Sequence, residues 1–95
     1  NDPHAIIVRH VRCTNPEILG KDLQAVAMST GMSCRITRIL RDGILRPLRS
    51  SDTLVPNDEV LMIGEQEKLA HDAAILGHFT NQGSNALIFP GSVRL

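Results

Sequence analysis

The chain has 95 residues, so it forms one domain, and its core buries about 60–65% of the surface that the unfolded chain exposes. Hydrophobic residues make up 42% of the sequence, but Phe79 and Phe89 are its only aromatic residues, which argues against a stacking platform for single-stranded nucleic acid. The formal net charge is zero, so we expect no direct binding of nucleic acid, because counterion release provides little driving force. No apolar run approaches the roughly 20 residues that span a bilayer, and we expect a soluble domain.

The first predicted element is a strand over residues 5–13. Its alternation puts Val11 and Cys13 on one face and Arg12 on the other. The strand ends before Asn15-Pro16, because Asn favours turns and Pro cannot donate to a ladder.

A short helix is predicted over residues 21–28, where Leu23, Val26 and Ala27 recur at helical spacing. Gly31 follows it and is expected to cap the helix or form a loop in a left-handed conformation.

A β-hairpin is predicted next, with strands over residues 33–41 and 44–48. The Asp42-Gly43 pair between them is the strongest short signal for a tight hairpin turn. Pro47 lacks an N–H group, which places the second of these strands at a sheet edge or at a bulge.

The remaining core elements follow a polar connection over residues 51–59, from which Leu54 returns to the core. Residues 60–63 (VLMI) are wholly apolar, which predicts a central strand buried on both faces. A helix over residues 65–76 follows, with acidic residues in its first turn, and Gly77 is expected to stop it.

These elements predict an α+β domain with a mainly antiparallel sheet of four to five strands, covered on one side by two helices. The domain is expected over residues 5–77. Residues 78–95 are interpreted as a C-terminal tail or linker, with a short added strand as an alternative.

No arrangement of residues predicts catalysis or a metal site. There is no nucleophile elbow and no glycine-rich dinucleotide turn, and Asp58 and Glu59 are adjacent, so they point to opposite faces of an extended chain. Cys13 and Cys34 form no Cys-x-x-Cys motif, and the four histidines are scattered, so we expect neither zinc nor a cofactor. Both thiols are expected to be reduced and buried in apolar surroundings.

Five arginines on the predicted hairpin are the candidate ligand-binding residues: Arg35, Arg38, Arg41, Arg46 and Arg49. The guanidinium group suits bidentate pairing with phosphate or carboxylate. Strand alternation predicts Arg35 and Arg41 on one face and Arg38 on the other, with Arg41 and Arg46 in cross-strand range. The alternative is that acidic residues of the second half, which carries six acidic and two basic side chains, neutralise these cations.

A spaced set of motifs runs through the predicted core. It comprises Thr14-Asn15-Pro16-Glu17, Leu19-Gly20-Lys21-x-Leu23, Ile39-x-Arg41-Asp42-Gly43, Asp52-Thr53-Leu54 and Asn57-Asp58-x-Val60-Leu61-Met62-Ile63-Gly64. The pattern resembles the TrkA-C domain, the C-terminal lobe of the modules that regulate potassium conductance (RCK), over about residues 8–77. Asn57 stands where the family usually has Gly, and Asn also tolerates positive φ.

The motif residues have structural interpretations of their own. Gly20 and Gly64 are expected to allow turns into the two helices, and Lys21 to be a solvated residue at a helix start. Asp58 is expected to cap backbone N–H groups of its own turn.

The resemblance implies a non-enzymatic, cytoplasmic regulatory domain that senses a ligand as part of a membrane transporter or channel for potassium or another cation. It implies a homodimer acting on a transmembrane part of the same or a partner protein, with a small anionic ligand such as a nucleotide in the dimer cleft. Two alternatives stay open. One is an insert of an aspartate–alanine exchanger-type transporter, and the other is an effector domain attached to a DNA-binding regulator.

Overall fold

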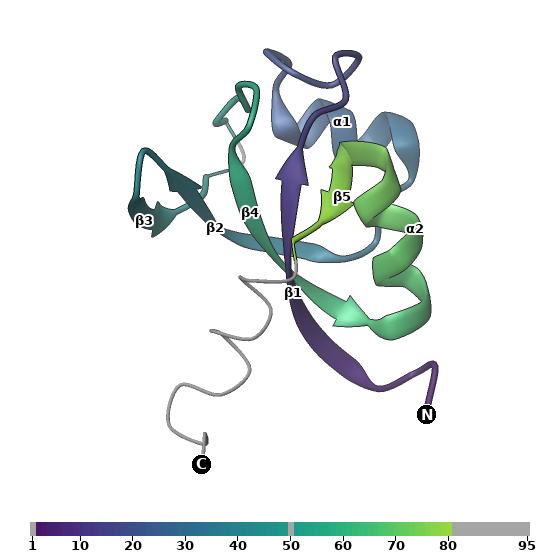
Figure 1. Ribbon diagram of the computed structural model, residues 1–95. Helices are drawn as coiled ribbons and strands as arrows, with labels where there is room; N and C mark the ends of the chain where they lie inside the picture. The colour runs from purple at the N-terminus through teal and green to yellow at the C-terminus, as the bar shows by residue number, and fades with distance from the viewer. Residues whose placement is uncertain (1, 50, 81–95) are drawn as a thin grey trace.

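A computed structural model of the chain describes residues 2–49 and 51–80 (Figure 1). The elements along these ranges are β1 (Ile6–Cys13), α1 (Leu23–Thr30), β2 (Arg35–Arg41), β3 (Ile44–Pro47), β4 (Glu59–Glu65), α2 (Gln66–Leu76) and β5 (Gly77–Phe79). The strands form one sheet in the order β3-β2-β4-β1-β5, and all four neighbouring pairs are antiparallel. The predicted α+β fold is confirmed, with five strands and two helices.

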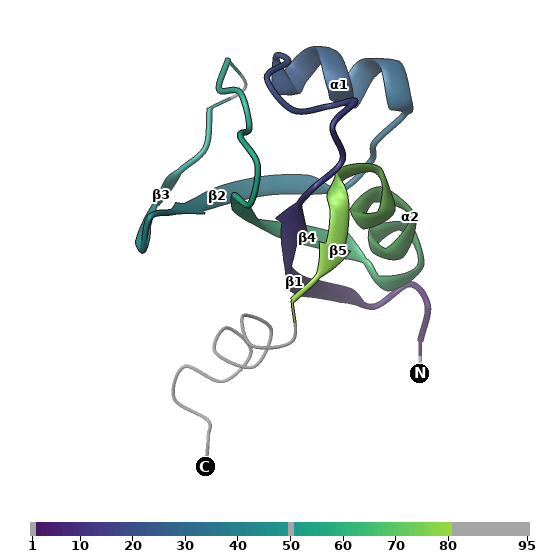
Figure 2. The ribbon, with the colours of Figure 1, turned by 45° about the horizontal axis from the view of Figure 1, so that its top comes forward.

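Both helices lie on the same side of the sheet, as Figure 2 shows. The core between them and the sheet is almost entirely aliphatic. Its strand residues include Val11 and Cys13, as predicted, and the two helices contribute Leu23, Val26, Leu69, Ala73 and Leu76. Leu54, from the connection between β3 and β4, is also buried, so this connection does return to the core.

The hairpin between β2 and β3 is confirmed as a tight two-residue turn. Asp42 has φ 54° and Gly43 has φ 78°, so both central residues are left-handed, as a turn that matches the strand twist requires. Pro47 ends β3, which is an edge strand. Its missing N–H therefore costs little there.

A β-bulge in β2 overturns the expected distribution of the arginines. Arg35 pairs with Ile63 and Arg38 with Leu61, and the register shifts between Ile36 and Arg38. Because the extra residue reverses the alternation, Arg35 and Arg38 share one face, and Arg41 lies on the other. The prediction that Arg35 and Arg41 share a face was wrong for this reason.

Strand β4 is central, as predicted, but it is not buried on both faces. Val60 and Met62 point to the helices and are fully buried, whereas Leu61 and Ile63 are half-buried on the opposite side. One side of the apolar run VLMI is therefore more deeply buried than the other, because both helices lie on one side of the sheet.

Helix α1 begins two residues later than predicted, because Asp22 is its N-cap. The Asp22 carboxylate accepts hydrogen bonds from the Gln24 N–H (2.8 Å) and the Ala25 N–H (3.3 Å). Gly31 caps the C-terminus in the left-handed conformation, at φ 71°, as expected. Lys21 is exposed just before the helix, and Gly20, at φ 79°, makes the turn into it.

The TNPE motif connects the end of β1 to the end of α2. The Asn15 side chain donates to the Ile75 carbonyl (2.8 Å) and accepts from the Glu17 N–H (3.0 Å). The N–H groups of Thr14 and Asn15 both donate to the Leu76 carbonyl. Pro16 is exposed in the turn that follows. The motif thus satisfies carbonyl groups that a helix C-terminus leaves free.

The prediction for Gly64 was wrong, whereas Gly77 stops the second helix as predicted. Gly64 lies inside β4, where a Cβ atom would overlap the Cys34 sulfur, so the position requires close approach, not a turn into the helix. Gly77 does end α2, but the chain continues directly into β5, which pairs with β1 at Val11, Arg12 and Cys13. The sheet therefore extends past residue 77, and residues 81–95 of the predicted tail lie outside the described residues.

Candidate ligand pocket and arginine sites

An apolar pocket of about 300 Å³ opens between α1, β2 and the segment that follows β3. Its lining is mostly aliphatic and sulfur-containing, and Gln24 and Arg49 are its two polar residues. The lining residues are Leu23, Gln24, Ala27, Met32, Cys34, Ile36, Leu48 and Arg49. A pocket that is apolar inside and has few polar groups matches the usual character of small-molecule sites.

The two outer walls of the pocket are tied together by backbone bonds. The Leu23 N–H donates to the Asp52 carbonyl (3.2 Å), and Asp22 forms a β-bridge with Thr53. The Gly20 N–H donates to the Leu54 carbonyl (2.8 Å). The start of α1 is therefore fixed to the connection between β3 and β4.

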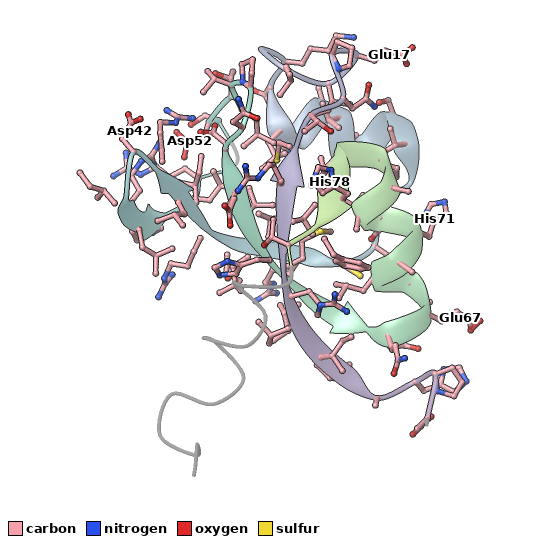
Figure 3. All side chains as sticks on the ribbon, in the orientation of Figure 1. Glu17, Asp42, Asp52, Glu67, His71 and His78 are labelled. Atoms are coloured by element: carbon pink, nitrogen blue, oxygen red, sulfur yellow. The ribbon has the colours of Figure 1, made fainter. Side chains whose placement is uncertain are left out.

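Asp72 of α2 fixes the loop that leads into β2, where Cys34 lines the pocket. Its carboxylate is 1% exposed and accepts from the Cys34 N–H (2.7 Å) and the Ser33 N–H (2.9 Å), so it fixes the loop that leads into β2. The His71 ring contacts the other oxygen at 2.9 Å, and this side chain extends away from α2 into solvent (Figure 3). Burial acts to raise the pKa of Asp72, but the hydrogen bonds from His71, Cys34 and Ser33 outweigh it and hold the pKa below its usual range.

Sequence reasoning missed Asp72. The available signal was its position on the apolar stripe of α2, three residues after Leu69 and next to Ala73, because an acidic residue on a buried stripe needs hydrogen-bond donors. An acidic residue on the apolar stripe of a helix therefore indicates hydrogen bonds to a neighbouring element of the fold.

Arg41 and Arg46 are the two candidate arginines with carboxylate partners. Arg41 binds Asp58 in bidentate fashion (2.8 and 2.7 Å), and these hydrogen bonds raise the pKa of the guanidinium group. Asp58, 2% exposed, also accepts from the Val55 N–H (2.9 Å), which confirms that it caps its own turn. Arg46 lies 3.3 Å from Asp52, so the acidic second half does neutralise these two cations.

The other three candidate arginines lie elsewhere. Arg49 lines the pocket. Its backbone N–H donates to the Asp52 carboxylate (2.7 Å), and this hydrogen bond lowers the pKa of Asp52. Arg35 and Arg38 are exposed on the sheet face away from the helices. Arg35 and Arg38 therefore lie on a different sheet face from Arg41, and of the five arginines Arg49 lines the pocket.

The two cysteines are free thiols in different surroundings. Cys13 is completely buried, and burial raises its pKa to about 12. Cys34 is half-buried at the pocket wall, where burial and the nearby Asp72 carboxylate raise its pKa to about 11. Within residues 2–49 and 51–80, no group of three or more His, Cys, Asp or Glu side chains could hold a metal ion.

No helix in the described part of the chain is long and apolar enough to cross a membrane. The sequence profile of the TrkA-C domain matches residues 7–77, from the second residue of β1 to the first residue of β5. No curated protein matches the chain at a significant level.

Proposed function

Because the chain belongs to the TrkA-C domain family, we propose that it is a ligand-sensing regulatory domain at the cytoplasmic face of a membrane transporter or channel that carries potassium or another cation. Domains of this family are regulatory, not catalytic, and they generally form part of transporters. The domain is accordingly proposed to bind its effector without chemical change and to act on a linked transmembrane part.

The observation that carries this proposal is the apolar pocket with Arg49 at its wall. Ile36, Leu48 and Met32 offer apolar contact to a flat ring such as a nucleobase, and Arg49, which also lines the pocket, has a side chain suited to bidentate contact with a phosphate. A small anionic nucleotide combines these two features.

Ligand binding in this pocket has a direct route to the rest of the domain. Cys34 lines the pocket, and its N–H is held by Asp72 of α2. Asn15 and the end of β1 are bonded to the C-terminus of the same helix. A ligand that favours one position of the pocket wall therefore biases the position of α2 relative to the sheet.

The domain is proposed to act as a homodimer. Met28, on the helix that forms one wall of the pocket, is 77% exposed, so its side chain is available for a contact between two copies of the domain. A twofold contact that buries Met28 would involve the same helix that lines the pocket, and such isologous contacts are the commonest in homo-oligomers.

Calorimetry with cyclic dinucleotides, mononucleotides and inorganic phosphate tests the ligand. We expect at least one nucleotide to bind, Arg49→Ala to weaken it about tenfold or more, and inorganic phosphate to bind far more weakly. The double variant Arg35→Ala with Arg38→Ala, two exposed cations on the sheet face away from the helices, controls for general loss of positive charge and should leave affinity within about threefold. Absence of nucleotide binding at millimolar concentration would remove the ligand proposal.

The sequence that flanks these 95 residues in the gene separates the proposed contexts. Hydrophobic spans of about 20 residues place the domain in a transporter, including one of the exchanger type, whereas a helix-turn-helix places it in a DNA-binding regulator.

A further inference from the structure

We propose that the sheet face opposite the helices is a docking surface for an acidic amphipathic helix of a partner protein. This face, called the outer face below, is defined by side chains that share one side of four strands. They include Val8 of β1, Arg35, Arg38 and Leu40 of β2, Leu45 of β3, and Leu61 and Ile63 of β4, and this side also carries His10, Arg12, Glu59 and Glu65.

The register places the apolar members of the outer face in two cross-strand pairs that Leu61 links diagonally, since the direct partners of Leu61 are His10 and Arg38. Val8 pairs with Ile63 across β1 and β4, and Leu40 pairs with Leu45 across β2 and β3. Leu61 lies between these pairs, two residues from Ile63 on the same strand. Leu45 is 52% exposed, which is a large exposure for a leucine next to other apolar side chains.

The charges on the outer face are not balanced. Its carboxylates have partners, since Glu59 binds Arg12 at 2.7 Å and Glu65 binds His4 at 2.9 Å. Arg35 and Arg38, which flank Ile63 and Leu61 in the register, form no ion pair with any described residue. Two uncompensated guanidinium groups beside an apolar strip select an occupant with both apolar and acidic side chains.

We expect the partner to bind as a helix, because the outer face offers side chains to a partner and no free backbone N–H or C=O groups with which an added strand could pair. The outer edge of β3 offers little for strand addition, since this strand has four residues and ends at Pro47. A helix laid on the second face of the sheet buries its apolar stripe as α2 does on the first face.

Selection from a library of randomised helical peptides on the 95-residue chain tests the proposal, and Ile44 provides a matched control. Ile44 and Leu45 are adjacent, both exposed (66% and 52%), and on opposite faces of β3. We expect the enriched peptides to be amphipathic and acidic, Leu45→Asn to weaken them about tenfold or more, and Ile44→Asn to change affinity less than about twofold.

Charge variants give a second, independent readout. Arg35→Ala with Arg38→Ala should weaken the selected peptides and flatten the dependence of their affinity on salt, whereas Lys21→Ala, an exposed cation elsewhere, should do neither. The proposal is overturned if no peptide is enriched, if the enriched peptides are neutral or basic, or if Ile44→Asn acts like Leu45→Asn. Tighter binding to phosphatidylglycerol vesicles than to any peptide, or a monomer produced by Leu45→Asn, also overturns it.

Discussion

Two buried aspartates, Asp58 and Asp72, connect elements that are distant in the sequence. Asp58 joins the connection after β3 to Arg41 of β2, and Asp72 joins α2 to the loop before β2. Both carboxylates are almost fully buried, and each is satisfied by several donors. Removing such a carboxylate leaves donors without partners, which costs more than the bond itself contributes.

Asp72→Asn is therefore expected to lower the free energy of unfolding by about 1–2 kcal/mol, since the amide accepts more weakly than the carboxylate. Chemical denaturation with urea measures this change. His71→Gln removes an exposed partner of the same carboxylate and should cost less than about 0.5 kcal/mol. Equal losses for the two variants would contradict the assigned role of Asp72.

The same carboxylate makes stability depend on pH. The pKa of Asp72 is lower in the folded protein than in the unfolded chain, so the carboxylate contributes stability that is complete above about pH 4 and is lost as the pH falls through the folded-state pKa. The difference in unfolding free energy between the wild type and Asp72→Asn should accordingly shrink below about pH 4. A difference that stays constant from pH 7 to pH 3 would show that the charge is not involved.

The raised thiol pKa values predict low reactivity. With a pKa of about 11, Cys34 should react with iodoacetamide at pH 7.5 roughly 100-fold more slowly than a free thiol, because the thiolate is the nucleophile. Cys13, which is completely buried, should react only after unfolding. Mass spectrometry of timed samples measures both rates. Rapid labelling of both thiols in the native state is the result that would refute this expectation.

At the scale of elements, the contact between β4 and the start of β2 is set by Gly64 and Cys34. Gly64→Ala should destabilise the domain by about 1–3 kcal/mol, since the new Cβ would overlap the Cys34 sulfur. Cys34→Ala should recover part of this loss, but not all, because the Cys34 Cβ would remain 3.0 Å from the new atom. A double-mutant cycle measured by thermal unfolding tests the coupling, and strict additivity of the two changes would exclude it.

The type and order of the elements could be predicted from the sequence because local signals fix them. Asp42-Gly43 specifies the hairpin, and Gly31 ends α1. The bulge at residues 36–38 could not be predicted, since no Gly or Pro marks it, and it arises where β2 pairs with β4. For that reason the faces of Arg35 and Arg41 were assigned incorrectly.

The site was less predictable than the fold. Arginine chemistry identified Arg49 as one of five equal candidates, but the pocket is formed by segments that are brought together only in the folded chain, from Leu23 to Arg49. Asp72, which fixes the pocket wall, is 38 residues from the N–H of Cys34 that it binds. Contacts of this kind depend on tertiary structure, which a local pattern does not record.

At the scale of the whole molecule, the exposed Met28 predicts how copies associate. We expect a homodimer at micromolar concentration and expect Met28→Glu to convert it to a monomer, because two buried carboxylates related by a twofold axis would repel each other. Light scattering measures the mass, and Ile44→Glu, which adds the same charge at the distant hairpin, should remain dimeric. A monomeric wild type would exclude this mode of association.

The sheet order β3-β2-β4-β1-β5 also has a consequence for how the chain folds. The first strand has neither of its neighbours nearby in the sequence, since it lies between β4 and β5, which are the last two strands of the described chain. During synthesis, β1 must wait until Phe79 has left the ribosome before its pairing is complete. Non-local pairing of this kind slows folding, and β1 stays unpaired until β4 has been synthesised.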